Sequence, residues 1–155
     1  MDVAANTPDI RRIFAASRLH TDGRPYAVIS LPLDQLRPAT TLFGRLAEPF
    51  TAMIVDKDEI TIVMHEMDWA LRNGGLTDVR VESNYRLITF DLPLALDVVG
   101  FMAVVSRLLA DAGIPIVPIA AYSRDHIFIR GQDVERAWQT LSGFIDACRS
   151  SSESG

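Results

Sequence analysis

The stretch over residues 85–115, YRLITFDLPLALDVVGFMAVVSRLLADAGIP, decides the fold of this chain. Its first part, residues 85–92, is rich in β-branched and aromatic side chains. Ile88, Phe90 and Leu92 fall on one side of an extended chain, because successive side chains of a strand point to opposite faces. This alternation predicts a strand with one apolar face.

A helix is predicted after this strand, over residues 98–112. Apolar residues recur there at intervals of three and four, which places them on one helical face. Asp97 precedes the first of them and carries a side chain suited to an N-cap. Gly113 and Pro115 predict the end of the helix, since glycine tolerates a left-handed C-terminal turn and proline cannot continue a helix.

Toward the C-terminus the pattern continues with a hairpin and a second helix. Residues 114–121 predict a buried strand, residues 122–125 a turn and residues 126–130 the returning strand. Apolar residues at helical spacing predict a last helix over residues 134–148. The order of elements is therefore strand, helix, strand, strand, helix.

The first half of the chain repeats this order more loosely. Residues 26–31 predict a strand, residues 38–47 a short helix, and residues 50–55 and 60–65 a hairpin, before a short helical piece around Trp69. The repetition predicts an α+β protein with an internal duplication, in which two ferredoxin-like βαββα units have antiparallel sheets.

Neither half contains an obvious fourth strand of its own. Residues 79–82 are one candidate, and residues 13–18 are another, which would pair with the second unit. The predicted boundaries are an N-terminal segment at 1–25 with this possible pairing strand, a first unit at 26–82, a second unit at 85–148 and a disordered tail at 149–155.

Composition and charge exclude several classes of protein. The 155 residues are 48% hydrophobic and 23% charged, which is typical of a globular protein. The net charge is −5, and the basic residues are dispersed, with Arg11-Arg12 the only adjacent pair, so we expect no nucleic-acid partner. Uncharged apolar stretches are shorter than the ~20 residues needed to cross a bilayer, so we expect no membrane span.

The single cysteine, Cys148, allows no intrachain disulfide and is consistent with a reducing compartment. The first residues, MDVAAN, lack the basic start and apolar run of a signal peptide. Both observations predict a cytoplasmic protein.

Enzyme signatures are weak. His65-Glu66 begins like a zinc-protease helix, but Trp69 occupies the position of the second histidine. Asp125 and His126 adjoin Ser123, yet neighbours in a strand point to opposite faces, which disfavours a catalytic triad. We therefore expect no enzyme, with no catalytic residue, no metal site and no cofactor.

Several segments together resemble a known family. The C-terminal unit of small tandem ACT-domain proteins resembles residues 90–109 with residues 112–116, the stretch YSRDHI at residues 122–127, and residues 134–141. Residues 26–28 and 60–63 look like the matching N-terminal unit. This family includes the cytosolic arginine-sensor proteins of animals. The resemblance implies a protein that binds a small amino-acid-like ligand and regulates a protein partner. The edge strands of such small sheets favour a homodimer.

By resemblance, the ligand pocket lies where the strand meets the long helix and at the facing hairpin. A free amino acid needs amide donors for its carboxylate, as at a helix N-terminus, and an acceptor such as Asp97 for its ammonium group. The family has small hydroxyl residues before the helix glycine, whereas residues 97–99 of this chain are Asp-Val-Val. The resemblance therefore does not identify the ligand. The predicted ligand-binding residues are Asp97, Val98, Val99, Gly100, Ser123 and Asp125.

Each of these residues also has an ordinary structural use, as a cap, a turn residue or a close packing contact. Two functions therefore remain from the sequence. One is an amino-acid sensor or regulatory protein, and the alternative is a ligand-free module for protein interaction or dimerisation.

Overall fold

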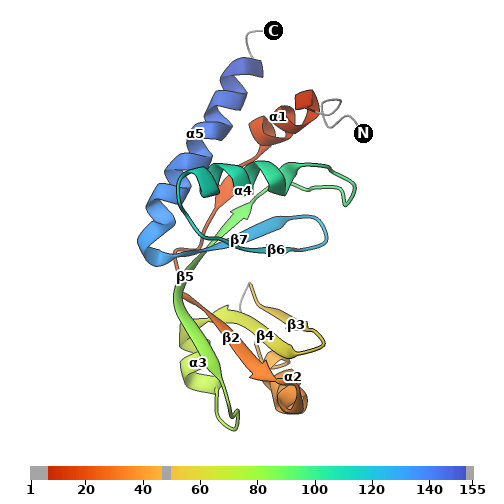
Figure 1. Ribbon diagram of the computed structural model, residues 1–155, viewed down its shortest axis with the longest axis vertical. Helices are drawn as coiled ribbons and strands as arrows, with labels where there is room; N and C mark the ends of the chain where they lie inside the picture. Colours follow the sequence, from red (N-terminus) through yellow and green to blue (C-terminus); the bar gives the residue numbers. More distant parts are fainter. Residues whose placement is uncertain (1–6, 47–49, 153–155) are drawn as a thin grey trace. The chain divides into compact units, whose positions relative to one another are not determined.

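The computed structural model describes residues 7–46 and 50–152, and the chain divides into two compact units. Unit 2 is the continuous segment Gly23–Arg86, whereas unit 1 combines Met1–Asp22 with Leu87–Gly155. Unit 2 is thus inserted in the sequence of unit 1. The long strand β5 (Arg80–Phe90) contributes residues to both units (Figure 1).

Unit 1 is a sheet with helices packed on it. The strands follow the order β6-β7-β5, and β1 pairs antiparallel with β5, with Leu19 opposite Phe90. This is the ferredoxin-like arrangement, and β1 takes the place of the fourth strand. The elements in chain order are α1 (Thr7–Ala16), β1 (Leu19–His20), the end of β5, α4 (Phe101–Asp111), β6 (Val117–Ala120), β7 (Asp125–Arg130), a 3₁₀ turn (Gly131–Asp133) and α5 (Val134–Ser152).

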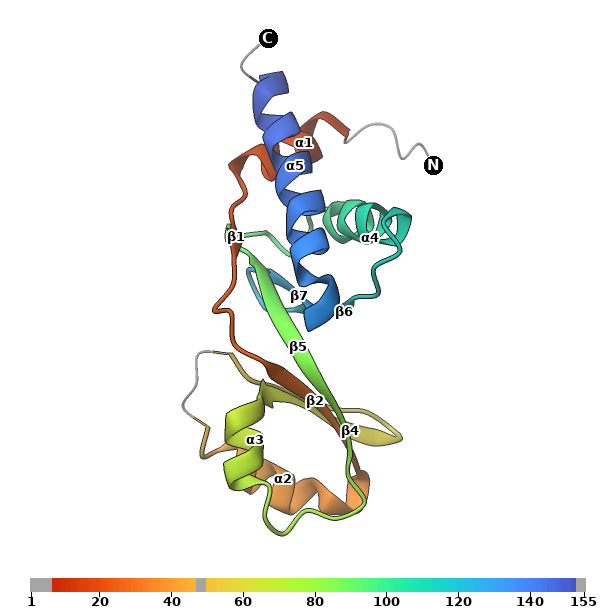
Figure 2. The same ribbon diagram turned by 90° about the vertical axis from the view of Figure 1, so that its left-hand side faces the viewer.

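The core of unit 1 lies between its helices and its sheet. Ile88 and Phe90 of β5 point into it, as their alternation predicted. The ring of Phe14 in α1 stacks on Phe101 of α4 at 4.4 Å between centroids, and meets the edge of Phe144 of α5 at 5.1 Å. Helix α1 therefore belongs to the helical layer of unit 1, next to α5 (Figure 2).

Unit 2 repeats the arrangement. Its strands follow the order β3-β4-β2-β5, and its core contains Ile29, Ile60 and Ile62 from the two central strands together with Leu42 of α2. The elements are β2 (Tyr26–Pro32), a 3₁₀ turn (Leu33–Gln35), α2 (Leu36–Phe43), β3 (Ala52–Val55), β4 (Glu59–His65), α3 (Glu66–Arg72) and the start of β5. The predicted α+β fold with antiparallel ferredoxin-like units is confirmed.

The prediction of a strand at residues 13–18 is wrong for most of that segment. Residues up to Ala16 are helical, because Ile10, Ile13 and Phe14 recur at helical spacing and pack on the core of unit 1. The strand that pairs with the second half is instead β1, residues 19–20. Residues 79–82 do contribute a strand, because β5 begins at Arg80 and pairs with β2 in unit 2.

Two helix ends also differ from the prediction. Helix α5 continues to Ser152, although a disordered tail was predicted from residue 149. Arg149 holds this end, since its guanidinium donates hydrogen bonds to the carbonyls of Ala15 and Ser17. Helix α2 ends at Phe43, and the predicted end at residue 47 lies outside the described residues, as do residues 1–6 and 153–155.

None of the described helices is long and apolar enough to cross a membrane.

Candidate functional site

The segment between β5 and α4 in unit 1 is held by backbone hydrogen bonds at several points. The amide of Asp91 donates to the carbonyl of Arg18 at 2.7 Å, and that of Leu94 donates to the carbonyl of Ser123 at 2.7 Å. The amide of Val98 closes a turn on the carbonyl of Ala95 at 3.2 Å. These bonds place the segment against both the N-terminal strand and the β6–β7 hairpin.

Helix α4 begins later than the sequence predicted. Its N-cap is Gly100, with φ +90°, and its first residue is Phe101, so the prediction that Asp97 caps the helix is wrong. Only glycine adopts this left-handed conformation without strain, and here it turns the chain directly into the helix. Among the residues that the structure describes, no side chain caps this N-terminus. The amide groups of the first turn, whose partners would lie before the helix start, are therefore available to a ligand.

A cavity of about 280 Å³ opens beside this helix start. Its walls are residues 94–96 and 98 of the preceding segment, residues 100–103 at the start of α4, and residues 120–122, 124 and 125 of the hairpin. The first helical turn therefore faces the same space as the hairpin. A helix N-terminus carries partial positive charge, so this wall favours an anionic group.

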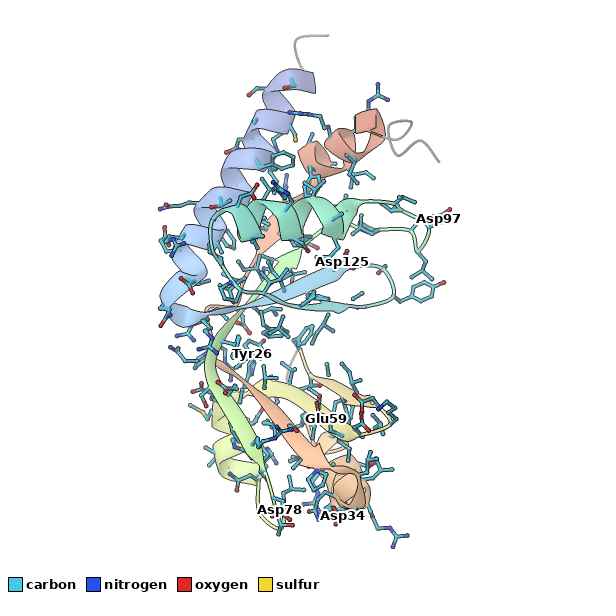
Figure 3. The ribbon with its side chains drawn as sticks, viewed as in Figure 1. Tyr26, Asp34, Glu59, Asp78, Asp97 and Asp125 are labelled. Atoms are coloured by element: carbon cyan, nitrogen blue, oxygen red, sulfur yellow. The ribbon has the colours of Figure 1, made fainter. Side chains whose placement is uncertain are left out.

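Asp125, at the start of β7, lines the same cavity (Figure 3). Burial raises the pKa of its carboxyl above the ordinary value. Within the described part of the chain this carboxylate has no hydrogen bond or ion pair. A half-buried carboxylate without a partner is an acceptor for a ligand ammonium group.

The cavity has a further charged residue that the sequence analysis missed. Arg124 lines it, and its Nε donates to Oδ1 of Asp91 at 3.1 Å. This ion pair joins the hairpin to the end of β5 and gives the arginine a carboxylate partner, so Asp125 is the charged residue of the cavity that lacks a partner among the described residues. No sequence motif joins Asp91 to Arg124, since 33 positions separate them.

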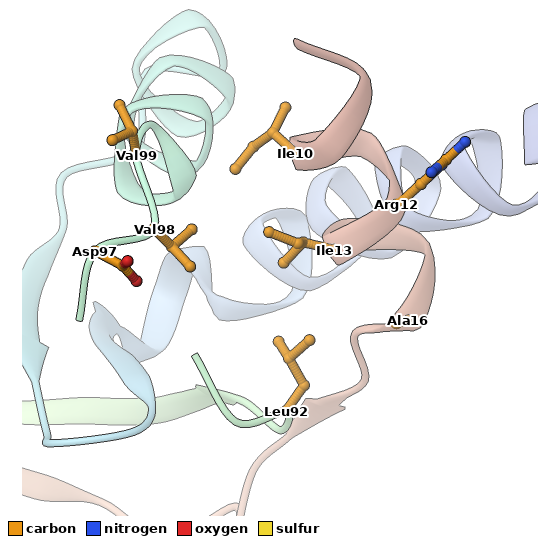
Figure 4. Close-up of a pocket in the computed structure, with 8 residues that line it drawn as sticks. All are labelled: Ile10, Arg12, Ile13, Ala16, Leu92, Asp97, Val98 and Val99. Atoms are coloured by element: carbon orange, nitrogen blue, oxygen red, sulfur yellow. The ribbon is translucent and has the colours of Figure 1, made fainter. Parts of the chain in front are cut away.

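The six residues predicted for the site do not all line one cavity. Val98, Gly100 and Asp125 line the cavity. Asp97 and Val99, together with Val98, line a separate groove of about 430 Å³ beside α1, where Val98 points toward Ile13 (Figure 4). Ser123 lines neither space, and its carbonyl accepts the hydrogen bond from Leu94.

The corresponding corner of unit 2 is built differently. A 3₁₀ turn, Leu33–Gln35, leads from β2 straight into α2, and the amide of Leu36 donates to the carbonyl of Leu33. No glycine interrupts this turn, and the Gln35 side chain accepts a hydrogen bond from the amide of Thr77 at 3.2 Å. Among the described residues of either unit, no cluster of three His, Cys, Asp or Glu side chains could hold a metal ion.

Comparison with known families identifies the segment that carries this corner. Residues 80–143 match the family model of the ACT domain. This part of the chain is therefore similar to an ACT domain. The match spans β5, α4, the β6–β7 hairpin and the first half of α5, so the residues that line the cavity all lie within the matched segment. No curated protein sequence matches the chain with significance.

Solved structures share the fold at low sequence identity. Protein VC0802 of Vibrio cholerae, of unknown function and described as a possible transport protein, is 24% identical, with a TM-score of 0.63 over 86% of this chain and 94% of its own. Protein Atu0741 of Agrobacterium tumefaciens is 22% identical, with a TM-score of 0.61 over 83% and 89%. The regulatory subunit of aspartate kinase from Thermus thermophilus, in a ligand-free form, is 12% identical, with a TM-score of 0.62 over 82% and 97%.

Proposed function

We propose that this chain is a regulatory protein that binds a small zwitterionic ligand, an amino acid or a close relative, in the 280 Å³ cavity of its ACT domain. One observation carries the proposal: the uncapped first turn of α4 and the unpaired carboxylate of Asp125 line the same cavity. The amides suit a carboxylate and Asp125 suits an ammonium group, so both charges of an amino acid find a partner.

The size of the cavity supports a small ligand. Ligand pockets in proteins usually measure ~300–1,000 Å³, and this cavity of about 280 Å³ lies just below that range, which suits a small ligand. The fold shared with an aspartate kinase regulatory subunit supports a regulatory role in place of catalysis. The proposal includes a cytoplasmic homodimer that passes the ligand signal to a protein partner.

A thermal-shift screen against the free amino acids tests the proposal. A ligand at a hundredfold excess over its Kd stabilises a protein by ~2.7 kcal/mol, which is readily measured. Asp125→Asn is expected to abolish this stabilisation, because it removes the charge opposite the ammonium group. Asp97→Asn is the matched control, since Asp97 is an exposed acid of the same unit outside the cavity. A flat response to all amino acids, or a shift that survives Asp125→Asn, would contradict the proposed site.

The alternative, a ligand-free interaction module, also has an observation in its favour. Leu96, Val99 and Tyr122 are 74%, 65% and 83% exposed, and they come from the segment before α4 and from the β6–β7 turn. Exposed apolar groups of this size are common at protein interfaces. Sedimentation at several concentrations, with and without Tyr122→Ser, distinguishes a dimer formed through these residues from a monomer.

A further inference from the structure

We propose that unit 1 has a second small-molecule site, the α5 groove, which binds a carboxylate carried on a flat apolar group. The groove measures about 330 Å³ and lies between residues 17–19, which follow α1, and the face of α5 that carries Trp138, Ser142, Asp146 and Arg149. It shares no lining residue with the cavity beside α4. The site is therefore independent of the proposed function.

Arg149 forms part of the wall of the groove, and three hydrogen bonds hold its side chain. Its Nε donates to the carbonyl of Ala15 at 3.0 Å, its Nη2 to that of Ser17 at 2.7 Å, and its Nη1 to Oδ1 of Asp146 at 3.0 Å. One guanidinium thus joins the C-terminal end of α1 to α5. Because all three nitrogens are engaged within the protein, Arg149 shapes the site, and a ligand must find its charge partner elsewhere.

Ser17 supplies the observation that points to a ligand. Its side chain is completely buried, and it lines the groove. Its amide donates to the carbonyl of Phe14 and its carbonyl accepts from Arg149, but Oγ has no hydrogen-bond partner among the residues that the structure describes. A buried hydroxyl without a partner is unfavourable and uncommon in folded proteins. A polar ligand atom in the groove would satisfy it.

Arg18 supplies the charge. Its backbone is fixed, because its carbonyl accepts the amide of Asp91 at 2.7 Å. Its side chain is exposed, and no described residue pairs with its guanidinium. A guanidinium binds a carboxylate through two parallel hydrogen bonds, so a carboxylate beside Ser17 Oγ would use both groups at once.

Trp138 supplies the apolar wall and favours a flat ligand body. Its indole is only partly buried, although it packs against the core from α5, and Ile145 lies seven residues, or about two helical turns, further along the same face. Aromatic side chains bind flat groups through their faces or edges. The ligand class that satisfies all these groups is an arylalkyl carboxylate.

Trp138 also provides the readout for a direct test. The chain has two tryptophans, so Trp69→Phe leaves Trp138 as the only indole. Phenylacetate is titrated against this variant. Acetate, which lacks the ring, and phenethylamine, which lacks the carboxylate, serve as comparison probes. We expect phenylacetate to change the fluorescence in a saturable manner, and acetate and phenethylamine to bind at least about tenfold more weakly.

Point variants connect that signal to the groove. Arg18→Ala is expected to weaken phenylacetate binding about tenfold. Arg107→Ala is the matched control, since Arg107 is 80% exposed and lies on α4 outside the groove. Ser17→Ala is expected to weaken binding and to raise the Tm of the unliganded protein. Asp125→Asn is expected to leave binding unchanged, which separates this site from the cavity beside α4.

Three results would overturn the α5 groove as a carboxylate site. These are no saturable change with phenylacetate up to millimolar concentration, equal binding of phenethylamine, and binding that survives both Arg18→Ala and Ser17→Ala. The last result would mean that water satisfies Ser17 and that the probe binds elsewhere.

Discussion

The imidazole Nδ1 of His126 lies 2.9 Å from the hydroxyl Oγ1 of Thr89, and this pair is buried between β7 and β5 of unit 1. His126 is only 8% exposed. Burial lowers the pKa of its imidazole, and the nearby positive charge of Arg124 lowers it further. The pair therefore holds a neutral histidine inside the sheet of unit 1.

This pair predicts that the protein loses stability in mild acid. The pKa of His126 is lower in the folded protein than its ordinary value of 6.5, so below that pH the unfolded chain binds more protons than the folded one. The free energy of unfolding is expected to fall as the pH decreases from 6.5 through the folded pKa, and to level off below it. Urea denaturation at a series of pH values measures this.

His126→Gln is expected to flatten that pH profile, because glutamine can hydrogen-bond to Thr89 without titrating in this range. His20→Gln is the control, since His20 is exposed in β1 and its removal should leave the profile unchanged. An undiminished acid effect in His126→Gln would assign the loss of stability to another group.

Asp125→Asn is expected to leave the unliganded protein as stable as the original, or more stable, at neutral pH. Burial raises the pKa of Asp125, so the folded state loses stability as the pH rises from 3.8 through the folded pKa and the carboxyl becomes charged. Asparagine avoids this cost. Calorimetry of the unliganded variants measures the effect, with Asp97→Asn for comparison. A marked decrease in Tm would show that Asp125 has a structural role that the contacts do not reveal.

Replacement of Gly100 and of Gly143 by alanine is expected to change the free energy of unfolding in opposite directions. Gly100 has φ +90°, so Gly100→Ala should destabilise by ~1–2 kcal/mol through backbone strain. Gly143 lies inside α5, where Gly143→Ala should stabilise by ~0.5–1 kcal/mol. A Cβ at either position would meet no atom of the described residues within 4 Å, so packing does not obscure the comparison. Urea denaturation measures both, and effects of the same sign would contradict the conformation assigned to Gly100.

Arg149→Met is expected to destabilise unit 1 by ~1–3 kcal/mol, because two backbone carbonyls near the end of α1 lose a charged donor. Arg107→Met removes an exposed pair with Asp111 within α4 and should cost at most ~0.5 kcal/mol. Equilibrium unfolding followed by circular dichroism compares the two. Equal effects would show that the link between α1 and α5 adds nothing to stability.

Much of each unit was predictable because hydrophobic periodicity reports local burial. The apolar face of β5 at Ile88 and Phe90 and that of α4 at Val105 and Leu109 are both in the core. The prediction that α4 ends at Gly113 was also correct, since Gly113 adopts the left-handed conformation with φ +68°. The sequence was misleading at Asp97, where a good capping residue precedes an apolar run but the chain makes a further turn before the helix begins.

The amino-acid sequence by itself determined most of the strands and helices and the turn that Gly100 makes before α4, because these depend on residues close together in the chain. Tertiary structure alone decided that residues 19–20 complete the sheet of unit 1, that Asp125 and not Asp97 lines the cavity, and that Ser17 is buried without a partner for Oγ. The physical reason is that these features arise from contacts between distant residues, such as Ser17 with Arg149, 132 positions apart. No local pattern encodes such contacts.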